Sequence, residues 1–355
     1  MLNSVVRHLR STRLYRWLRL ANQEHFFTEH PQAYADCDPE EAKRIHGQMK
    51  RAYILYDIPY LDFWWSRCDC MDKSQWRSVV PYKRQRALWL MINAPSAKEL
   101  LDDKWKTFQH FREFYHRELF CVPKESADMS GLSAFIERHP CFVVKPHGGR
   151  WGIGVHLFDA EAHSDPARYL VERYADGFVA EEFIVQDEAL GRFHPESVNT
   201  LRIHTYMGPD SIDIKWPCFR MGRGDSFVDN AGAGGIFGAI DVSTGVIIGV
   251  GDESHHVYEK HPDTGVQILG FKIPHWEEAC EMVRLMAKRI PECRFVAWDL
   301  ALTQEGWVMV EGNYSPLLIW QFAAGTGMGP EFDPIEKQAK KLSGHPRSFL
   351  SENIS

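Results

Sequence analysis

Residues 298–313 read WDLALTQEGWVMVEGN, two apolar runs separated by a short polar turn. The alternation within each run predicts a β-hairpin that turns at residues 304–306. Glu311 and Asn313 are two positions apart, so their side chains share one face of their strand, and Asp299 can lie opposite them. Without a cation, two carboxylates about 4 Å apart would repel by roughly 4 kcal/mol at an intermediate dielectric. Two carboxylates and an amide oxygen are hard ligands, so the hairpin predicts a Mg²⁺ site shared with substrate phosphates.

A strand that carries carboxylates precedes this hairpin in the chain. Residues 177–190 read GFVAEEFIVQDEAL, an apolar run that contains Glu181 and Glu182, with Glu188 just beyond. Carboxylates beside an apolar strand end are costly unless they have partners, and a purine amino group and ribose hydroxyls would serve. The alternative is an edge strand with solvated glutamates, and this stretch alone leaves both open.

A glycine-rich segment follows a strand-end lysine further upstream. Residues 143–155 read VVKPHGGRWGIGV, with the lysine at position 145. Val155 follows the last glycine, which excludes a P-loop, and the strand-like residues beyond it exclude a dinucleotide fingerprint. The segment is either a hairpin lid, whose amides would hold phosphate oxygens beside Lys145, or a structural turn between strands. Trp151 at its tip would cover a nucleotide or pack on a neighbour.

Arginines gather near a second glycine cluster. Residues 199–206 (NTLRIHTY) and 218–241 (CFRMGRGDSFVDNAGAGGIFGAID) predict strands that flank flexible backbone. Arginines on strands next to such backbone are good binders of oxyanions. The side chains in question are those of Arg202, Arg220, Arg223 and Asn230.

The elements before residue 141 are predicted as helices. Up to about residue 94 the chain is rich in aromatic residues and lacks the repeated strands and glycine turns of a Rossmann half. A further helix is predicted from Ser96, a candidate N-cap, through residues 102–119, and it carries Lys104. Strands dominate from residue 141, residues 276–290 predict an amphipathic helix, and the tail from Glu336 is predicted to be a loose polar end.

Taken in order, these features resemble the ATP-grasp superfamily. The order is a lysine on a helix, a strand-end lysine, a glycine lid, the E-E-F-I strand and the D…E-G-N hairpin. Within the superfamily the chain is most similar to the sugar-transfer-associated ATP-grasp family, and the similarity covers roughly residues 100–329. It is carried by HPESVNTLRI (194–203), the DN-GAGG-ID-TG block (229–245), HPDTG (261–265) and the hairpin. The NAGAGG segment also resembles the corresponding block of bacterial glutathione synthetases.

The resemblance implies an α+β fold of the ATP-grasp type, in which two α+β subdomains clasp ATP after a helical N-terminal module. The expected boundaries are residues 1–95 for the module, 96–178 for the first subdomain with its lid, 179–335 for the second subdomain with the metal hairpin, and 336–355 for the tail.

The resemblance also implies roles for individual residues. Lys104 and Lys145 would hold the α- and β-phosphates, and Gly148, Gly149, Gly152 and Gly154 would form the lid. Glu181, Glu182 and the backbone around Phe183 and Ile184 would bind adenine, and Glu188 the ribose. Asp299, Glu311 and Asn313 would bind two Mg²⁺ ions, and Arg202, Arg220 and Asn230 would face the transferred phosphoryl or acyl group.

The implied reaction is ATP-dependent ligation of a small-molecule or peptide carboxylate to an amine through an acyl phosphate. A kinase that phosphorylates a hydroxyl or sugar-type acceptor would use the same nucleotide site. A module that binds ATP without turnover is the third alternative.

Composition sets outer limits on the function. The 355 residues are 44% hydrophobic and 25% charged, which is an ordinary globular balance, and the net charge of −7 argues against nucleic acid as a partner. No apolar run is long enough to span a bilayer, and arginines interrupt any signal-peptide core, which predicts a cytoplasmic protein. The eight cysteines lack metal-type spacing, and the C-x-C at residues 68–70 has no second pair. His255, His256 and His261 are expected to be loop and substrate-side residues and not a metal cluster.

The N-terminal segment has a pattern of its own. Residues 1–25 place arginines at positions 7, 10, 13, 16 and 19 between apolar residues, which predicts a basic amphipathic helix. Such a helix would lie on an anionic membrane surface or an acidic protein partner, or pack on its own domain with the arginines in water.

Overall fold

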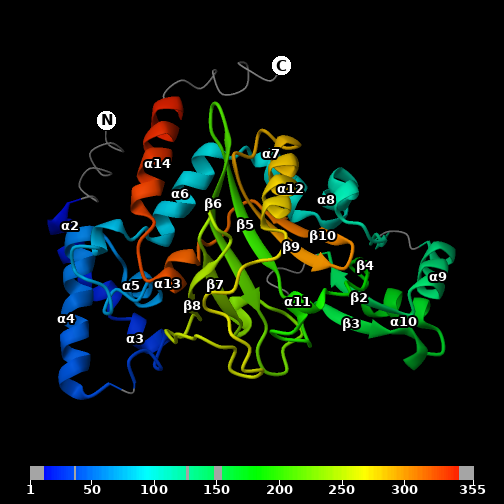
Figure 1. Cartoon of the computed structure of the whole chain (residues 1–355), viewed down its shortest axis with the longest axis horizontal. Helices are drawn as coiled ribbons and strands as arrows, with labels where there is room; N and C mark the ends of the chain where they lie inside the picture. Colours follow the sequence, from blue (N-terminus) through cyan, green and yellow to red (C-terminus); the bar gives the residue numbers. More distant parts are fainter. Residues whose placement is uncertain (1–11, 36, 125–127, 148–153, 344–355) are drawn as a thin grey trace.

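The computed structural model describes residues 12–35, 37–124, 128–147 and 154–343. It contains two antiparallel sheets with flanking helices, preceded by a helical region (Figure 1). The helical region and the smaller sheet lie at opposite ends of the larger sheet. The predicted α+β architecture with a helical N-terminal part is therefore confirmed. Within the described ranges, no helix has the length and apolar character needed to cross a membrane.

The helical region has its own hydrophobic core. Its described α-helices are α2 (Arg13–Leu18), α3 (Phe26–Glu29), α4 (Pro39–Tyr56) and α5 (Tyr60–Trp65), whereas α6 (Tyr82–Ile92) packs on the larger sheet. Asp38 caps α4 by accepting hydrogen bonds from two backbone N–H groups, and the helix ends at Asp57 in the left-handed conformation. Met49, Phe63 and Trp76 are fully or almost fully buried between these elements.

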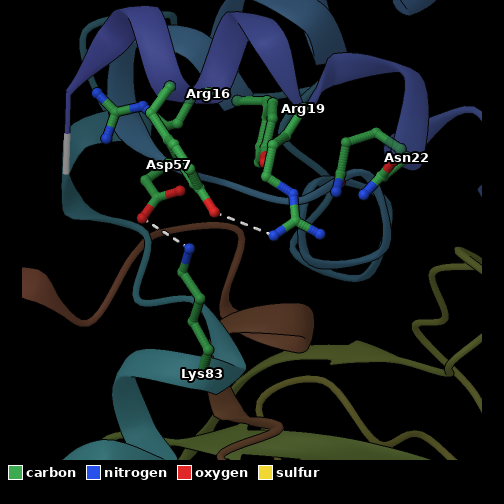
Figure 2. Close-up of a pocket in the computed structure, with 8 residues that line it drawn as sticks. Arg16, Arg19, Asn22, Asp57 and Lys83 are labelled. Atoms are coloured by element: carbon green, nitrogen blue, oxygen red, sulfur yellow. Dashed lines mark hydrogen bonds and ion pairs between the residues drawn. The ribbon is translucent and has the colours of Figure 1, made fainter. Parts of the chain in front are cut away.

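In the described part of the N-terminal segment, Arg16 faces the protein, whereas Arg13 and Arg19 are exposed. Arg16 donates a hydrogen bond from Nε to the carbonyl of Ile54 at 2.9 Å, and Arg16 and Arg19 line a pocket with Lys83 (Figure 2). Leu14 and Trp17 are instead 68% and 60% exposed. Because α2 packs on α4 and leaves Arg13 and Arg19 exposed, the alternative of a helix packed on its own domain fits α2, and a surface role stays a prediction. Residues 1–11 lie outside the described residues.

The first sheet has the strand order β1-β4-β2-β3. Its strands are β1 (Leu119–Val122), β2 (Cys141–Pro146), β3 (His156–Asp159) and β4 (Phe178–Glu182), and α9 (Met129–Arg138) and α10 (Pro166–Arg173) pack on it. Because β4 pairs with both β1 and β2, the predicted boundary at residue 178 is wrong. The first subdomain extends through Glu182.

The second sheet has the order β10-β9-β5-β6-β7-β8. Its strands are β5 (Leu201–Met207), β6 (Ile212–Met221), β7 (Ile236–Ile240), β8 (Ile247–Gly251), β9 (Phe295–Thr303) and β10 (Gly306–Asn313). Helix α12 (Trp276–Lys288) lies across β5, β6 and β9, and buries Val283 and Met286 there (Figure 1). The predicted hairpin of residues 298–313 is confirmed as β9 and β10.

Three sequence-based details need correction. Helix α7 (Pro95–Asp102) has Ala94 as its N-cap and not Ser96, because Pro95 occupies the first helical position. The helix predicted through residues 102–119 breaks at Asp103, whose side chain caps α8 (Lys104–Phe111). The C-terminal helices are α13 (Trp320–Ala324) and α14 (Gly329–Ser343). Residues 336–343 belong to α14 and bury Ala339, so the tail cannot begin at Glu336.

Candidate functional site

The three predicted metal ligands converge on the β9–β10 hairpin. Glu311 lies directly opposite Asp299 in the strand register, next to a bulge that follows Met309. The Asn313 amide donates to Asp299 Oδ2 at 3.5 Å and to Glu311 Oε1 at 3.2 Å. The two-residue spacing of Glu311 and Asn313 therefore places both side chains on the face that Asp299 reaches.

Two arginines hold the Asp299 carboxylate. Arg202 on the neighbouring β5 donates from Nε and Nη2 to the two oxygens at 2.7 Å each, and Arg220 on β6 donates to Oδ2 at 3.0 Å. Asp299 is fully buried, which alone would raise its pKa, but the charges of Arg202 and Arg220 outweigh burial and hold the pKa well below its usual range. The carboxylate therefore stays ionised.

Glu311 has the opposite electrostatic environment. Its side chain is exposed at the sheet edge, yet surrounding protein atoms strip part of its hydration. This desolvation, with repulsion from Asp299, raises the pKa of Glu311 above its ordinary value. Two carboxylates that oppose each other in this way fit a divalent cation between them, because the cation offsets the repulsion.

Arg220 is positioned by Asn230 and by two residues that the sequence did not single out, Thr200 and Asp229. It donates to Thr200 Oγ1 from Nε at 2.9 Å and from Nη2 at 2.7 Å, and from Nη1 to Asn230 Oδ1 at 3.4 Å. Asp229 accepts from the backbone N–H of Thr200 at 2.9 Å and lies 3.3 Å from Arg220. A Cβ at Gly235 would lie 2.5 Å from the Asp229 carbonyl, so this close approach of two backbone segments requires glycine.

The strand-end lysine pairs with the strand carboxylate on the first sheet. Lys145 Nζ lies 2.5 Å from Glu181 Oε2, and Arg117 Nε donates to Glu181 Oε1 at 2.7 Å. Burial would raise the pKa of Glu181, but Arg117 and Lys145 outweigh it and lower the pKa to about 2. Arg117 also donates to the carbonyl of Met309 on β10 at 2.6 Å, so it joins the two sheets.

Lys104 is the first residue of α8. It lies between the charged residues around Asp299 and those around Glu181. Its Nζ is 3.5 Å from the carbonyl of Pro146, at the end of β2. Desolvation and the positive charge of Lys145 lower the pKa of Lys104, while the carboxylate of Glu311 raises it. The net effect is a lowered pKa. Helix α8 also packs against β10, so Lys104, the end of β2 that carries Lys145 and the strand that carries Glu311 meet at one junction between the sheets.

Other predicted residues lie at the rim or outside this junction. Glu182 faces away from Glu181 and accepts from the backbone N–H of Glu118 at 2.9 Å. Phe183 is 36% exposed, and Ile184 is buried against β9 and β10. Glu188 is exposed at the start of α11 (Glu188–Gly191).

The predicted lid is described only at its end. Gly148, Gly149, Gly152 and Trp151 lie outside the described residues. Gly154 has a φ of 77°, and a Cβ there would lie 3.0 Å from Cγ of Pro146. Glycine is therefore favoured where the segment rejoins the sheet.

The three histidines turn toward separate partners. His256 lies 3.0 Å from Asp252, His261 bonds the carbonyl of Gly222 at 2.8 Å, and His255 reaches Asp69 in the helical region. Arg223 does not join Arg202 and Arg220 at Asp299. It donates to Asp252 at 3.2 Å.

Comparison with known proteins identifies one family. A sequence model of the sugar-transfer associated ATP-grasp family matches residues 83–337. No curated protein matches the chain.

Similar solved structures are distant in sequence. The ATP-grasp ligase PsnB complexed with minimal precursor is 13% identical, with a TM-score of 0.44 over 70% of this chain and 64% of PsnB. The D-alanine–D-alanine ligase from Bacillus anthracis is 12% identical, with a TM-score of 0.46 over 72% of each chain. N5-carboxyaminoimidazole synthetase from Staphylococcus aureus, complexed with ADP, is 14% identical, with a TM-score of 0.42 over 70% of this chain and 58% of that one. The chain thus spans less than two thirds of PsnB and of the synthetase.

Proposed function

The chain belongs to the sugar-transfer associated ATP-grasp family, and on this premise we propose that it is a Mg²⁺-dependent ligase that uses ATP to join a carboxylate to an amine. One observation carries the proposal. Lys104 reaches the end of β2 that carries Lys145, and its helix packs against β10, the strand of the second half that carries Glu311. Phosphate-binding cations next to a hard oxygen ligand set suit a metal–nucleotide complex.

The nucleotide occupies the junction between the two sheets. Lys104 and Lys145 bind the α- and β-phosphates as point charges. Glu181, kept ionised by Arg117, accepts a hydrogen bond from the adenine amino group, and the backbone at Phe183 and Ile184 meets the ring edge. Glu188 binds the ribose hydroxyls. Because the Glu182 side chain points the other way, only its backbone takes part.

Asp299, Glu311 and Asn313 would hold Mg²⁺, two ions by the family resemblance. The metal would offset charge on the β- and γ-phosphates and on the transferring phosphoryl group. To ligate a cation, the Asn313 amide must present its oxygen, since its nitrogen now faces both carboxylates. Arg202 and Arg220 bound to Asp299 keep that carboxylate ionised and oriented before the cation arrives.

The chemistry proceeds in two steps that need no nucleophilic side chain. A substrate carboxylate oxygen attacks the γ-phosphorus, the bond to the β-phosphate oxygen breaks, and ADP leaves. Arg202, Arg220 and Asn230 face the phosphoryl oxygens and stabilise their charge. An amine then attacks the acyl carbon of the acyl phosphate, the carbon–oxygen bond breaks, inorganic phosphate leaves and the amine loses a proton to solvent.

Hydroxylamine trapping tests this assignment. The full-length protein is incubated with ATP, Mg²⁺ and hydroxylamine, with a panel of amino acids, sugar acids and short peptides as carboxylates. We expect ADP and a hydroxamate to form in equal amounts with the accepted carboxylate. Glu311→Gln should slow the formation of both products about 100-fold, and Glu305→Gln, an exposed glutamate in the turn of the same hairpin, should form both at the wild-type rate.

Two outcomes would contradict the ligase. A stable phosphorylated alcohol or sugar, formed with ADP but without hydroxamate, would identify a kinase that uses the same nucleotide site. Tight ATP binding without ADP formation for any acceptor would identify a binding module.

A further inference from the structure

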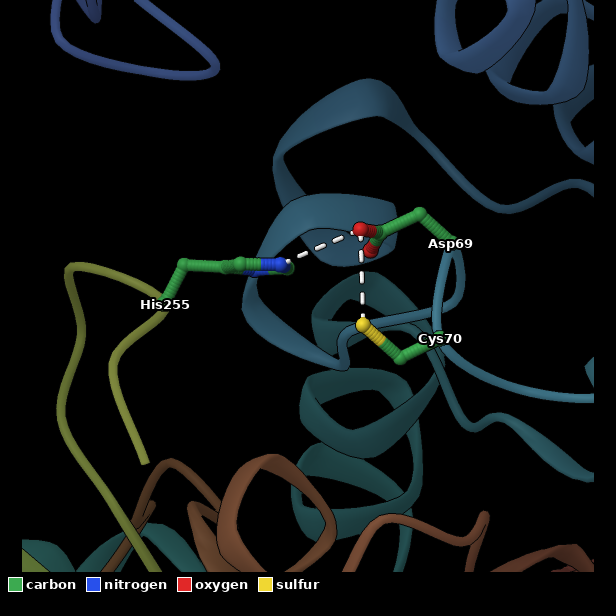
Figure 3. Close-up of side chains that lie close together, drawn as sticks. All are labelled: Asp69, Cys70 and His255. Atoms are coloured by element: carbon green, nitrogen blue, oxygen red, sulfur yellow. Dashed lines mark hydrogen bonds and ion pairs between the residues drawn. The ribbon is translucent and has the colours of Figure 1, made fainter. Parts of the chain in front are cut away.

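A compact group of ligand-type side chains lies away from the junction between the sheets. Asp69 and Cys70 follow α5 in the helical region, and His255 lies between β8 and α12 (Figure 3). One carboxylate oxygen, the thiol sulfur and one imidazole nitrogen lie within 4.8 Å of one another. From the sequence alone, neither the C-x-C nor the three histidines were assigned to a metal site. The pairing of Cys70 with His255 has no local pattern, because 185 residues separate them.

The spacing of these atoms is close to that of a tetrahedral metal site. His255 Nε2 lies 3.2 Å from Asp69 Oδ2, and Cys70 Sγ lies 3.5 Å from the same oxygen. Zinc bonds of about 2.1 Å to nitrogen or oxygen and about 2.3 Å to sulfur put neighbouring ligand atoms about 3.4 to 3.8 Å apart. Small shifts of the side chains would therefore bring all three atoms to bonding distance of one ion.

Two of the three side chains are oriented by outer hydrogen bonds. His255 Nδ1 lies 3.0 Å from the carbonyl of Trp64, which can only accept, so Nδ1 carries the hydrogen and Nε2 presents its lone pair in the neutral ring. Tyr34 donates its hydroxyl hydrogen to Asp69 Oδ1 at 3.4 Å, which leaves Oδ2 toward His255 and Cys70. Outer partners of this kind fix the tautomer and direction of metal ligands.

The backbone at His255 supports a fixed position. Its φ is 74°, in the left-handed region that few residues other than glycine occupy, although histidine is among the more frequent of them. Such a conformation persists only where the surroundings hold it. The Trp64 ring lies nearly parallel to the imidazole, at 7° and 6.4 Å between centroids, and helps hold it.

From this geometry we infer a binding site for a zinc-class divalent cation, formed by Asp69 Oδ2, Cys70 Sγ and His255 Nε2. A thiolate, an imidazole and a carboxylate suit zinc or cobalt better than Mg²⁺, which prefers oxygen alone. Among the described residues these three supply the ligand atoms, and because Cys70 is exposed, water can reach the fourth position.

The site would join the helical region to the second subdomain. The segment that carries His255 also carries Asp252, which accepts from Arg223 at 3.2 Å and from Tyr258 at 2.8 Å. A metal bound at His255 therefore fixes the segment in which Asp252 binds Arg223. Arg223 in turn lies next to the glycine block at residues 231–235. This role is structural and independent of the proposed ligase reaction.

A proton is the competing occupant. Burial would lower the pKa of His255, but the bonds to Asp69 and Cys70 raise it to about 9, so without metal the imidazolium would pair with Asp69. The experiment must therefore separate a metal site from an ion pair.

Cobalt titration of the full-length protein makes this separation. After treatment with a chelator, Co²⁺ is added under reducing conditions and the near-ultraviolet thiolate-to-cobalt charge-transfer band is recorded. We expect saturation at one equivalent, displacement by Zn²⁺ and a melting temperature that rises with Zn²⁺. Cys70→Ser should abolish the band, and Asp69→Asn and His255→Ala should weaken Zn²⁺ binding at least about 100-fold. Tyr34→Phe, which removes only an outer hydrogen bond, should weaken it about 10-fold.

Two exposed residues provide matched control variants. Cys141→Ser removes an exposed thiol on β2, and His256→Ala removes the exposed histidine next in the chain. Both should keep the band and the affinity. A wild-type protein without the band, or a Cys70→Ser variant that retains it, would overturn the site. Destabilisation by His255→Ala in a protein that binds no cobalt would show an ion pair only. Cys70 is exposed, so its serine variant should fold, and Tyr34→Phe provides a second test if it does not.

Discussion

The ammonium group of Lys145 lies 2.5 Å from the carboxylate of Glu181, so two groups that we assign to different parts of ATP are paired with each other. The lysine is assigned to a phosphate and the glutamate to adenine. Arg117 binds the second oxygen of Glu181 and keeps it neutralised when Lys145 turns to a phosphate. The pair therefore holds both side chains in place before the nucleotide binds.

Replacement of Lys145 by alanine should weaken ATP binding at least about tenfold and leave the fold intact. A charge-assisted contact to phosphate is lost, which is worth about 1.5 to 3 kcal/mol, while Glu181 keeps Arg117 as its partner. Calorimetric titration measures the affinity, with Lys124→Ala as a control on an exposed ion pair of the same subdomain. Unchanged affinity, or an unfolded variant, would mean that the lysine and its glycine segment serve only the fold.

The sequence alone was enough to predict the hairpin and its ligand set, but not the partners of Glu181. Asp299, Glu311 and Asn313 could be placed together because a strand has a period of two and the turn at Gly306 fixes which residues face each other. Arg117 could not be placed beside Glu181 in this way, because it lies just before β1 and belongs to no periodic pattern in the sequence. Its partners, Glu181 and the carbonyl of Met309, come from pairing and sheet contacts that span 64 and 192 residues.

The errors at element boundaries have local causes. Ser96 resembled an N-cap, but proline at the first helical position moves the cap to Ala94. The charged residues after Glu336 resembled a tail, yet Ile335 and Ala339 are four apart and both buried. That helical spacing was visible in the sequence and would have extended α14.

Acid should remove the contribution of Glu181 to stability. Its pKa is lowered to about 2 from a model-peptide value of 4.5, so the folded state favours the ionised form. A lowered pKa gives stability that is fully present above pH 4.5 and is lost as pH falls toward 2. The free energy of unfolding of wild type and Glu181→Gln, measured in urea from pH 7 to 2, should differ most above pH 4.5 and converge below it. A difference that does not change with pH would show that the two cations do not stabilise the carboxylate.

The exposed side of α2 should bind anionic membranes weakly. Leu14, Trp17 and Leu18 are 60–68% exposed, and Arg13 lies beside them. Replacing Leu14 and Trp17 by serine should reduce binding to vesicles that contain phosphatidylserine, and each arginine lost near the surface should cost about 1 kcal/mol. ADP formation should be unchanged, as it should after deletion of the first twenty residues. If the wild type does not sediment with these vesicles, the face serves another purpose, and loss of activity on truncation would make the segment part of the fold.

Magnesium should increase the stabilisation that ATP gives. Asp299, Glu311 and Asn313 offer oxygen ligands that only a cation can connect to phosphate. ATP alone should therefore raise the melting temperature slightly, and ATP with Mg²⁺ should raise it more, with a shift that grows with the logarithm of the ligand concentration. Equal shifts with and without Mg²⁺ would contradict a metal site on the hairpin.

Glu311→Gln separates nucleotide binding from chemistry. The amide keeps the shape and one carbonyl oxygen, but removes the negative charge opposite Asp299. ATP should still bind through Lys104, Lys145 and the β4 strand. The chemical step should suffer far more, because negative charge develops on the transferring phosphoryl group, where a cation held by Glu311 would offset it. Loss of about 100-fold in single-turnover ADP formation corresponds to about 2.7 kcal/mol of transition-state stabilisation.

The measurement uses saturating ATP, Mg²⁺ and the carboxylate found by trapping, with calorimetry to show that ATP affinity is retained. Rates within a few-fold of wild type would mean that Glu311 is not a metal ligand, and the role proposed for the hairpin would have to be withdrawn.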